Sequence, residues 1–295
     1  MSGTEQFAAH LAGGVTEVAR CWRVIRRDGQ TFGFTDHDCA LVFDGTTFKA
    51  DTGLSASALS QSTGLSVDNT EAIGALSDAS ITEADIEAGR FDGAEVEAWL
   101  VNWRAPENRV LQFRGSFGEL ERQAGGFQVE LRGLSEAMNR RMGRVYQRGC
   151  SAVLGDRECR FDLATPGYAH EGAADRVSDG RFLEFDGLNS FEPRWFERGR
   201  LRVLSGAAEG LVAVIKNDRF SDGNRRVELW EALRAELLPG DVVRLEAGCD
   251  KRMETCRLKF SNLLNFQGFP DIPGDDWVMA YPGRGTASMD GGSLR

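Results

Sequence analysis

The sequence of 295 residues contains only 7 prolines and 3 histidines, and it has no long apolar segment. No run approaches the about 18 consecutive apolar residues of a membrane-spanning helix, so we expect no membrane anchor. The stretch from Met1 to Gly14 lacks the basic and then apolar layout of a signal peptide, which predicts synthesis and folding in a cytoplasm. Three histidines leave little material for His-rich metal sites or for histidine catalysis.

Signatures of common enzyme classes are also absent. Neither G-x-S-x-G nor H-E-x-x-H occurs, so there is no nucleophile elbow and no zincin helix. Gly283-Arg284-Gly285-Thr286 looks like part of a phosphate loop, but no Walker lysine follows it. The sequence therefore predicts that the protein is not an enzyme.

Acidic residues outnumber basic ones, 45 against 35, which gives a formal net charge of −10 and a pI of about 5.0. Such a surface repels phosphate backbones, which argues against a dedicated DNA-binding protein. Hydrophobic residues make up 41% and charged residues 27%, as in ordinary folded proteins. The length predicts two domains, because about 100 to 200 residues form one.

Alternation of apolar and polar residues predicts strands in both halves of the chain. The segments are 22–27, 31–35, 95–101, 110–117 and 127–132, then 200–204, 211–216, 226–230 and 241–246. Arg27-Asp28-Gly29-Gln30 predicts a tight primed turn joining the first two, because glycine supplies the positive φ. The six tryptophans are expected mainly in cores, with Trp277 the candidate for a partner contact.

Few helices are expected. Thr82 is a capping residue before an acidic first turn, and Gly89 stops the helix that it opens. A second short helix is predicted over 134–142. The fold class is therefore mainly β with a minor α component. Composition shifts near Arg144, which predicts β-rich domains at 1–143 and 144–282 and a flexible, Gly- and Ser-rich tail at 283–295.

Four of the six cysteines form two close pairs, Cys150 with Cys159 and Cys249 with Cys256. Cys150 and Cys249 each follow a glycine, where backbone can approach closely. Cys21 and Cys39 are instead interpreted as core residues. Three interpretations of the pairs stay open: disulfides, which a cytoplasm disfavours; zinc, whose ligand pairs are usually closer in sequence; and an iron–sulfur cluster, whose thiolates come from broader loops.

The charges that flank the two cysteine pairs favour an anionic group. Seven basic residues stand against four acidic ones, an excess of +3 in an acidic chain. They are Arg148, Arg157, Arg160, Lys251, Arg252, Arg257 and Lys259 against Asp156, Glu158, Asp250 and Glu254. Positive charge favours thiolates and offsets a negatively charged cluster, although a solvated basic face would look the same.

Asp36-His37-Asp38 contains metal-ligand types but predicts no site. Adjacent residues of a strand point to opposite faces, so the three side chains cannot converge. We interpret the segment as a turn that its aspartates stabilise.

Several motifs resemble the tail hub, or baseplate hub, family of long-tailed phages and gene transfer agents. The carboxy-terminal ones are specific: Gly248-Cys249-Asp250-Lys251-Arg252, Thr255-Cys256-Arg257-Leu258-Lys259-Phe260, Asn262, Asn265-Phe266, Gly268-Phe269-Pro270 and Pro273-Gly274. Upstream are Gly33-Phe34-Thr35-Asp36-His37-Asp38, Cys150, Leu154-Gly155-Asp156 and Cys159. The similarity extends over roughly residues 7–277.

The resemblance implies hub-type barrels and a structural role in the virion tail. In the similar lambda-type tail tip protein such cysteines hold a 4Fe-4S cluster, which implies Cys150, Cys159, Cys249 and Cys256 as cluster ligands here. It further implies a homo-oligomer, a trimer, between the distal tail protein and the central tip or fibre protein, with DNA passing through its opening. A soluble iron–sulfur redox protein or a zinc-stabilised interaction module are the alternatives.

Overall fold

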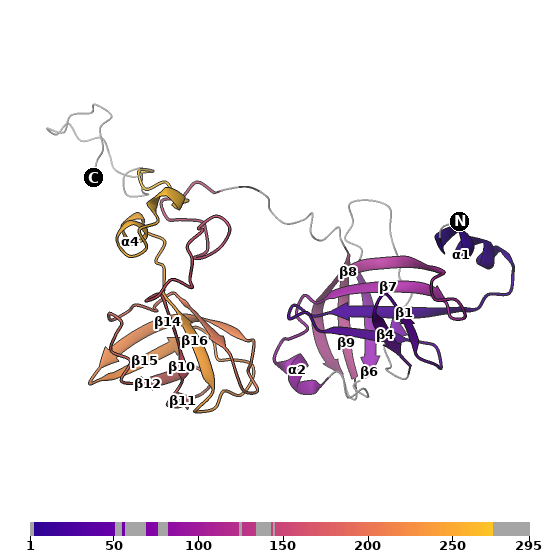
Figure 1. Ribbon diagram of the computed structural model, residues 1–295, viewed down its shortest axis with the longest axis horizontal. Helices are drawn as coiled ribbons and strands as arrows, with labels where there is room; N and C mark the ends of the chain where they lie inside the picture. The colour runs from indigo at the N-terminus through magenta and orange to yellow at the C-terminus, as the bar shows by residue number, and fades with distance from the viewer. Residues whose placement is uncertain are drawn as a thin grey trace. The chain divides into compact units, whose positions relative to one another are not determined.

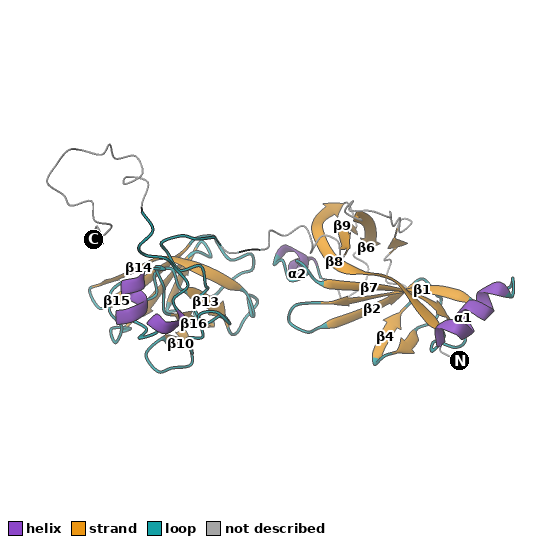
Figure 2. Cartoon of the chain, turned by 90° about the horizontal axis from the view of Figure 1, so that it is seen from above, coloured by secondary structure: helices purple, strands orange, loops and turns teal. Residues whose placement is uncertain are grey.

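The computed structural model describes residues 3–50, 55–56, 69–75, 82–123, 126–133, 143 and 145–273. The chain divides into two compact units, Met1–Met142 and Gly143–Arg295, and each is built around one β-sheet (Figure 1). The mainly β fold class is confirmed, and helices are few and short (Figure 2). Among the described residues, no helix has the length and apolarity to cross a membrane.

The first unit contains a nine-stranded sheet in the order β3-β4-β2-β1-β7-β8-β9-β6-β5, and its described residues include the helices α1 (Gly3–Ala12) and α2 (Glu83–Glu87). Its strands are β1 (Val18–Ile25), β2 (Thr31–Thr35), β3 (Leu41–Phe43), β4 (Thr46–Lys49), β5 (Ser55–Ala56), β6 (Asn69–Ala75), β7 (Glu95–Asn102), β8 (Arg109–Gln123) and β9 (Gly126–Gly133). All described pairings are antiparallel except β2 with β4.

Strand β1 shows how the sequence builds cores on both faces of this sheet. Trp22 and Val24 point into one cluster of buried residues, whereas Ala19 and Cys21 belong to a second. Successive side chains of a strand point to opposite faces of the sheet, so β1 contributes side chains to both clusters. Buried side chains therefore cover both faces of this sheet where β1 runs.

The β1–β2 hairpin is confirmed, but its turn is not of the primed type. Ile25 pairs with Thr31, and the N–H of Gly29 donates to the Arg26 carbonyl at 3.0 Å. Gly29 has φ of 87°, while Asp28 has no positive φ, and a primed type I turn needs both. Glycine here closes a longer loop. The primed pattern occurs instead at Asp44 and Gly45, between β3 and β4, where φ is 47° and 70°.

Helix α2 begins as the sequence predicts. The Thr82 hydroxyl accepts a hydrogen bond from the N–H of Asp85 at 3.1 Å, and Gly89 ends the segment with φ of 71°. Helix α1 and strands β3 to β6 were not predicted. The predicted helix at 134–142 and the tail at 283–295 lie outside the described residues.

The second unit contains a seven-stranded sheet in the order β10-β16-β13-β14-β15-β12-β11. Its elements are β10 (Ala169–Ala173), β11 (Arg176–Ser178), β12 (Phe182–Asp186), β13 (Arg200–Val203), β14 (Val212–Ser221), β15 (Asn224–Leu229), β16 (Val242–Glu246), α4 (Met253–Leu258) and the 3-10 helix η1 (Leu263–Asn265). One apolar cluster fills it. Figure 1 shows α4 and the neighbouring loops at one end of this sheet.

Candidate metal centre

The four paired cysteines lie together at the end of the second sheet. Cys150 and Cys159 belong to the loops before β10, Cys249 follows β16, and Cys256 lies in α4. All four line one small cavity of about 10 Å³, together with Ala152, Leu154, Lys251, Arg252, Phe260, Asn262 and Asn265. The fold thus brings together the segment with Cys150 and Cys159 and the segment with Cys249 and Cys256, although strands β10 to β16 lie between them in the sequence.

Backbone hydrogen bonds hold the Cys150 segment against the segment that follows β16. The N–H of Cys150 donates to the carbonyl of Lys251 at 2.8 Å. The Lys251 ammonium group returns a hydrogen bond to the carbonyl of Ala152. These two contacts, one from the backbone and one from a side chain, hold the segment of Cys150 beside the segment of Cys249.

Asp156 shapes the loop that presents Cys159. Its carboxylate accepts hydrogen bonds from the N–H groups of Val153, Glu158 and Cys159 at 2.7, 3.0 and 2.6 Å. Burial acts to raise the pKa of Asp156, but these three bonds and the nearby Lys251 outweigh it, and the pKa is lowered. The carboxylate therefore stays charged and keeps the loop closed at neutral pH.

Gly248 lets the chain enter the site before Cys249. Its N–H donates to the Trp195 carbonyl at 2.9 Å, and a Cβ at this position would overlap the Glu197 carbonyl. Gly149 differs, since its Cβ would meet only Lys251, at 3.7 Å. Only one of the two glycines that precede a cysteine is thus required by close approach of the backbone.

Burial is the main influence on the thiols. It raises the pKa of Cys249, while the backbone N–H and the charge of Lys251 lower it. Burial, followed by the other three cysteines of the cavity, raises the pKa of the Cys256 thiol to about 11. As a thiol, Cys256 donates to the Asn262 carbonyl at 3.3 Å. Metal ligation, which needs thiolates, therefore releases protons here.

Lys259 supplies buried positive charge beside the site. Its ammonium group donates to the carbonyls of Trp195 and Gly248 at 2.7 and 3.0 Å and lies 4.1 Å from the centre of the Trp195 ring. Burial lowers its pKa to about 8, although Cys249 and nearby carboxylates oppose this shift. Because both hydrogen-bond partners are neutral carbonyls, they do not neutralise the charge of Lys259, which can balance the negative charge of nearby thiolates.

The comparisons with known proteins decide the family. The model of the baseplate hub protein, N-terminal attachment domain, matches residues 4–162, more than half of the chain. The chain belongs to the baseplate hub protein family. A second model, phage conserved hypothetical protein BR0599, matches residues 194–276. The hub family membership places the protein in the virion tail baseplate, as the sequence resemblance predicted.

A solved structure agrees with this assignment. A chain from the "Virion of native gene transfer agent (GTA) particle" is 55% identical, with a TM-score of 0.91, over 99% of this chain and 100% of that chain. No curated protein matches. None of these descriptions mentions an iron–sulfur cluster, so the cluster expected for this hub protein stays a prediction.

The donor set suits a group held by thiolates. All six cysteines are free, so no disulfide competes for the four in the cavity. Among the described residues, no three His, Cys, Asp or Glu side chains are already arranged to hold a metal ion. Soft thiolate donors from broad loops fit an iron–sulfur cluster. The cavity has room for about one water molecule, so a cluster requires the sulfurs to move apart.

For Cys21 and the Asp36 segment the sequence predictions are confirmed, and for Cys39 the prediction is wrong. Cys21 is fully buried, as expected, but Cys39 is exposed because it lies in the turn after β2, outside the core. Asp36 stabilises that turn by accepting from the N–H of Arg20 at 2.6 Å, and His37 Nδ1 accepts from the N–H of Cys39 at 3.0 Å. The turn interpretation is confirmed.

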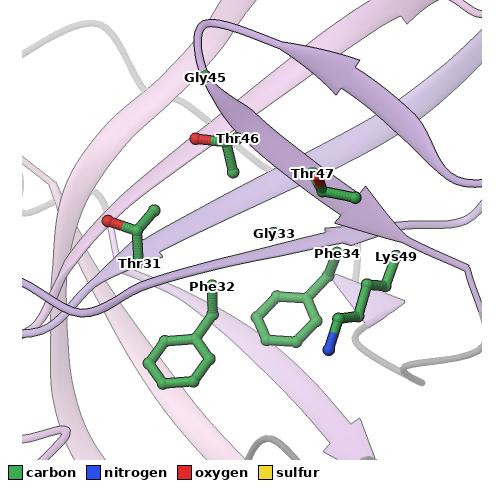
Figure 3. A pocket seen from close by; sticks show the side chains of 8 residues that line it. All are labelled: Thr31, Phe32, Gly33, Phe34, Gly45, Thr46, Thr47 and Lys49. Carbon is green, nitrogen blue, oxygen red and sulfur yellow. The ribbon is translucent and has the colours of Figure 1, made fainter.

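The expectation for the tryptophans is met only in part. Trp22 lies in the core, whereas Trp230 is 58% exposed. Trp277, the candidate for a partner contact, lies outside the described residues. Figure 3 shows a larger, open pocket of about 240 Å³ where β2 and β4 diverge beyond their two paired positions. Its lining, which includes Phe32 and Lys49, offers no cysteine, histidine or carboxylate. It therefore adds nothing to the metal centre.

Proposed function

We propose that this protein is a structural hub subunit in the tail of a gene transfer agent or a related phage. The observation that carries the proposal is the 55% identity, over nearly the full length of both chains, to a chain of a gene transfer agent virion. Three copies of the subunit form a homotrimeric ring between the distal tail protein and the central tip or fibre protein. It performs no catalysis.

DNA passes through the opening of this ring without specific binding. The net charge of −10 supports this role, because an acidic lumen repels phosphate and lets DNA slide. A map of the assembled particle tests it. Basic side chains lining the lumen would contradict the proposal.

Within the subunit, Cys150, Cys159, Cys249 and Cys256 hold a 4Fe-4S cluster. When bound, the cluster supplies a covalent link between segments that lie 90 residues apart, from Cys159 to Cys249. The protein contributes thiolates, the buried charge of Lys259 and the carboxylate of Asp156 that orders one loop. We assign the cluster a structural role rather than a redox one.

Anaerobic purification with iron, sulfide and zinc analysis tests the centre. About four iron and four sulfide per chain are expected, with the visible absorption typical of such clusters. Cys249→Ser should abolish it, while the matched control Cys39→Ser, an exposed cysteine of the first unit, should retain it. One zinc ion per chain, without iron and sulfide, would contradict the cluster and support a zinc-stabilised interaction module instead.

Particle assembly tests the hub role separately. Cells that produce particles with Cys249→Ser are expected to yield fewer complete tails, and those with Cys39→Ser a normal number. Electron micrographs of particles labelled on this subunit should show the label at the distal end of the tail. Label found only on free monomers that reduce reversibly would support the redox alternative instead.

A further inference from the structure

Segment 262–267 contributes no cysteine to the candidate centre, yet it contacts three of the four. The side-chain amide of Asn262 points an N–H at the Cys159 sulfur, with Nδ2 to Sγ at 3.6 Å. The backbone N–H of Gln267 points at the Cys150 sulfur at 3.4 Å. The carbonyl of Asn262 accepts from the Cys256 thiol. The segment therefore makes hydrogen bonds with the sulfur atoms of Cys150, Cys159 and Cys256.

The orientation of the Asn262 amide is determined by its own contacts. Asn265 Nδ2 donates to Asn262 Oδ1 at 2.7 Å, so that oxygen is occupied. The Asn262 Nδ2 group is left to face Cys159, where it also donates to the backbone carbonyl at 2.7 Å. The Asn262 N–H bonds back to the Cys256 carbonyl at 3.0 Å. One asparagine thus connects the second cysteine of each pair.

The Gln267 end of the segment is equally fixed. The N–H of Ser151 donates to the Gln267 carbonyl at 3.4 Å, and the N–H of Phe269 donates to the Gln147 carbonyl at 2.9 Å. Gly268 permits this approach, because a Cβ there would lie 2.7 Å from the Arg148 carbonyl. The donor to Cys150 is therefore held by backbone contacts on both sides.

We propose that Asn262 and the Gln267 backbone are N–H donors to the Cys159 and Cys150 sulfurs of the centre and that they tune its reduction potential. A neutral thiol gains little from accepting an N–H, whereas a thiolate gains a charge-assisted bond. Hydrogen bonds to the sulfurs of an iron–sulfur cluster also influence its potential. The proposal rests on the cluster assigned above and makes Asn262 a positioning residue, not a ligand.

Asn262→Leu tests the donor, because it keeps the approximate size and removes the N–H. In the full chain, reconstituted anaerobically, iron loss to a chelator is expected to be at least about 10-fold faster than in wild type. The reduction potential, followed by electron paramagnetic resonance, should become more negative. Asn262→Asp, which puts a carboxylate next to the sulfur, should lower it further.

Asn189→Leu is the matched control, since Asn189 is exposed in the loop after β12. It should leave iron loss and potential unchanged. If Asn262→Leu fails to fold by circular dichroism, Asn265→Ala replaces it, because that change only frees the Asn262 amide to rotate. A folded variant at Asn262 or Asn265 with wild-type potential and iron loss would overturn the inference. Absence of iron and sulfide from wild type would instead overturn the cluster itself.

Discussion

Cys21 and Cys39 are the same residue type in the same unit, and their surroundings give them opposite chemistry. Cys21 is fully buried, with its sulfur 3.5 Å from the Thr35 hydroxyl, whereas Cys39 is exposed. Burial raises the pKa of Cys21 to about 11, despite the hydrogen bond that lowers it. Thiolate, not thiol, reacts with electrophiles. We therefore expect iodoacetamide at pH 8 to label Cys39 and spare Cys21, as peptide mass spectrometry would show. Labelling of both at equal rates would contradict this.

The same burial gives a pH dependence. The pKa of Cys21 is raised in the folded state from its ordinary value of 9.0, so its stabilising effect is complete below pH 9 and is lost as pH rises through about 11. The loss should reach about 2 kcal/mol in the free energy of unfolding. Denaturant unfolding at pH 8 and pH 10.5 measures it. Cys21→Ala, less stable at pH 8, should show a smaller alkaline loss, and parallel profiles would rule the thiol out as the cause.

At the scale of elements, Gly149 and Gly248 offer a matched pair. Both precede a cysteine, but only Gly248 lies where a Cβ would meet backbone, at the Glu197 carbonyl. Gly248→Ala should therefore displace Cys249 and cost several kcal/mol, on the order of 3 or more, in the stability of the second unit. Gly149→Ala should cost less than about 1 kcal/mol. Iron content and unfolding midpoints measure both, and equal effects of the two variants would refute the difference.

The loop before β13 depends on a buried ion pair. Arg225 and Asp218 are fully buried and lie 2.9 Å apart, and the Asp218 carboxylate also accepts from the N–H of Phe196 at 2.9 Å. Arg225 donates in addition to the carbonyls of Phe191 and Glu192. Arg225→Met should cost about 3 to 5 kcal/mol, since it leaves a buried charge without its partner. Urea unfolding measures this loss. The double variant with Asp218→Leu should recover part of it.

Elements with regular alternation were predictable from the sequence, and those without it were not. Residues 31–35 coincide with β2, and 200–204 and 241–246 match β13 and β16 within one residue. Strands β10 to β12 were missed because they lack the alternation: AHEGA of β10 has no large apolar residue, RVS of β11 has one, and Phe182-Leu183 interrupts the pattern in β12. The turn at Gly29 was assigned the wrong type, because an Asp-Gly pair fits both a primed turn and a loop that only glycine closes.

The candidate site was predictable in its residues but not in its supports. Spacing and charge pointed to the four cysteines, and the fold brings them to one cavity. Asn262 occurs among the motifs that resemble the hub family, but neither Asn262 nor Gln267 shows by spacing or charge that it contacts a sulfur, because that depends on which carbonyl and sulfur atoms face it. Cys39 was misplaced for a related reason: an apolar residue near a strand end is in the core only if another element covers it.

At the scale of the whole molecule, the two units have separate cores, and only the second contains the cysteine cavity. Removal of the proposed cluster should therefore loosen one unit alone. Hydrogen exchange followed by mass spectrometry, on full chains with and without iron, is expected to show faster exchange in 147–160 and 248–269. Strands β1, β2, β7 and β8 should exchange at unchanged rates. Equal acceleration in both units would contradict their independence.

The path of the backbone through the second unit has a mechanical consequence. Strands β10 to β16 lie, in sequence, between the segment with Cys150 and the segment with Cys249, and the N–H of Phe269 bonds to the Gln147 carbonyl where the chain leaves. A force that pulls on both ends of this unit thus acts first on these crossing contacts and on the cysteines. The sheet between them therefore experiences no tension until that junction breaks.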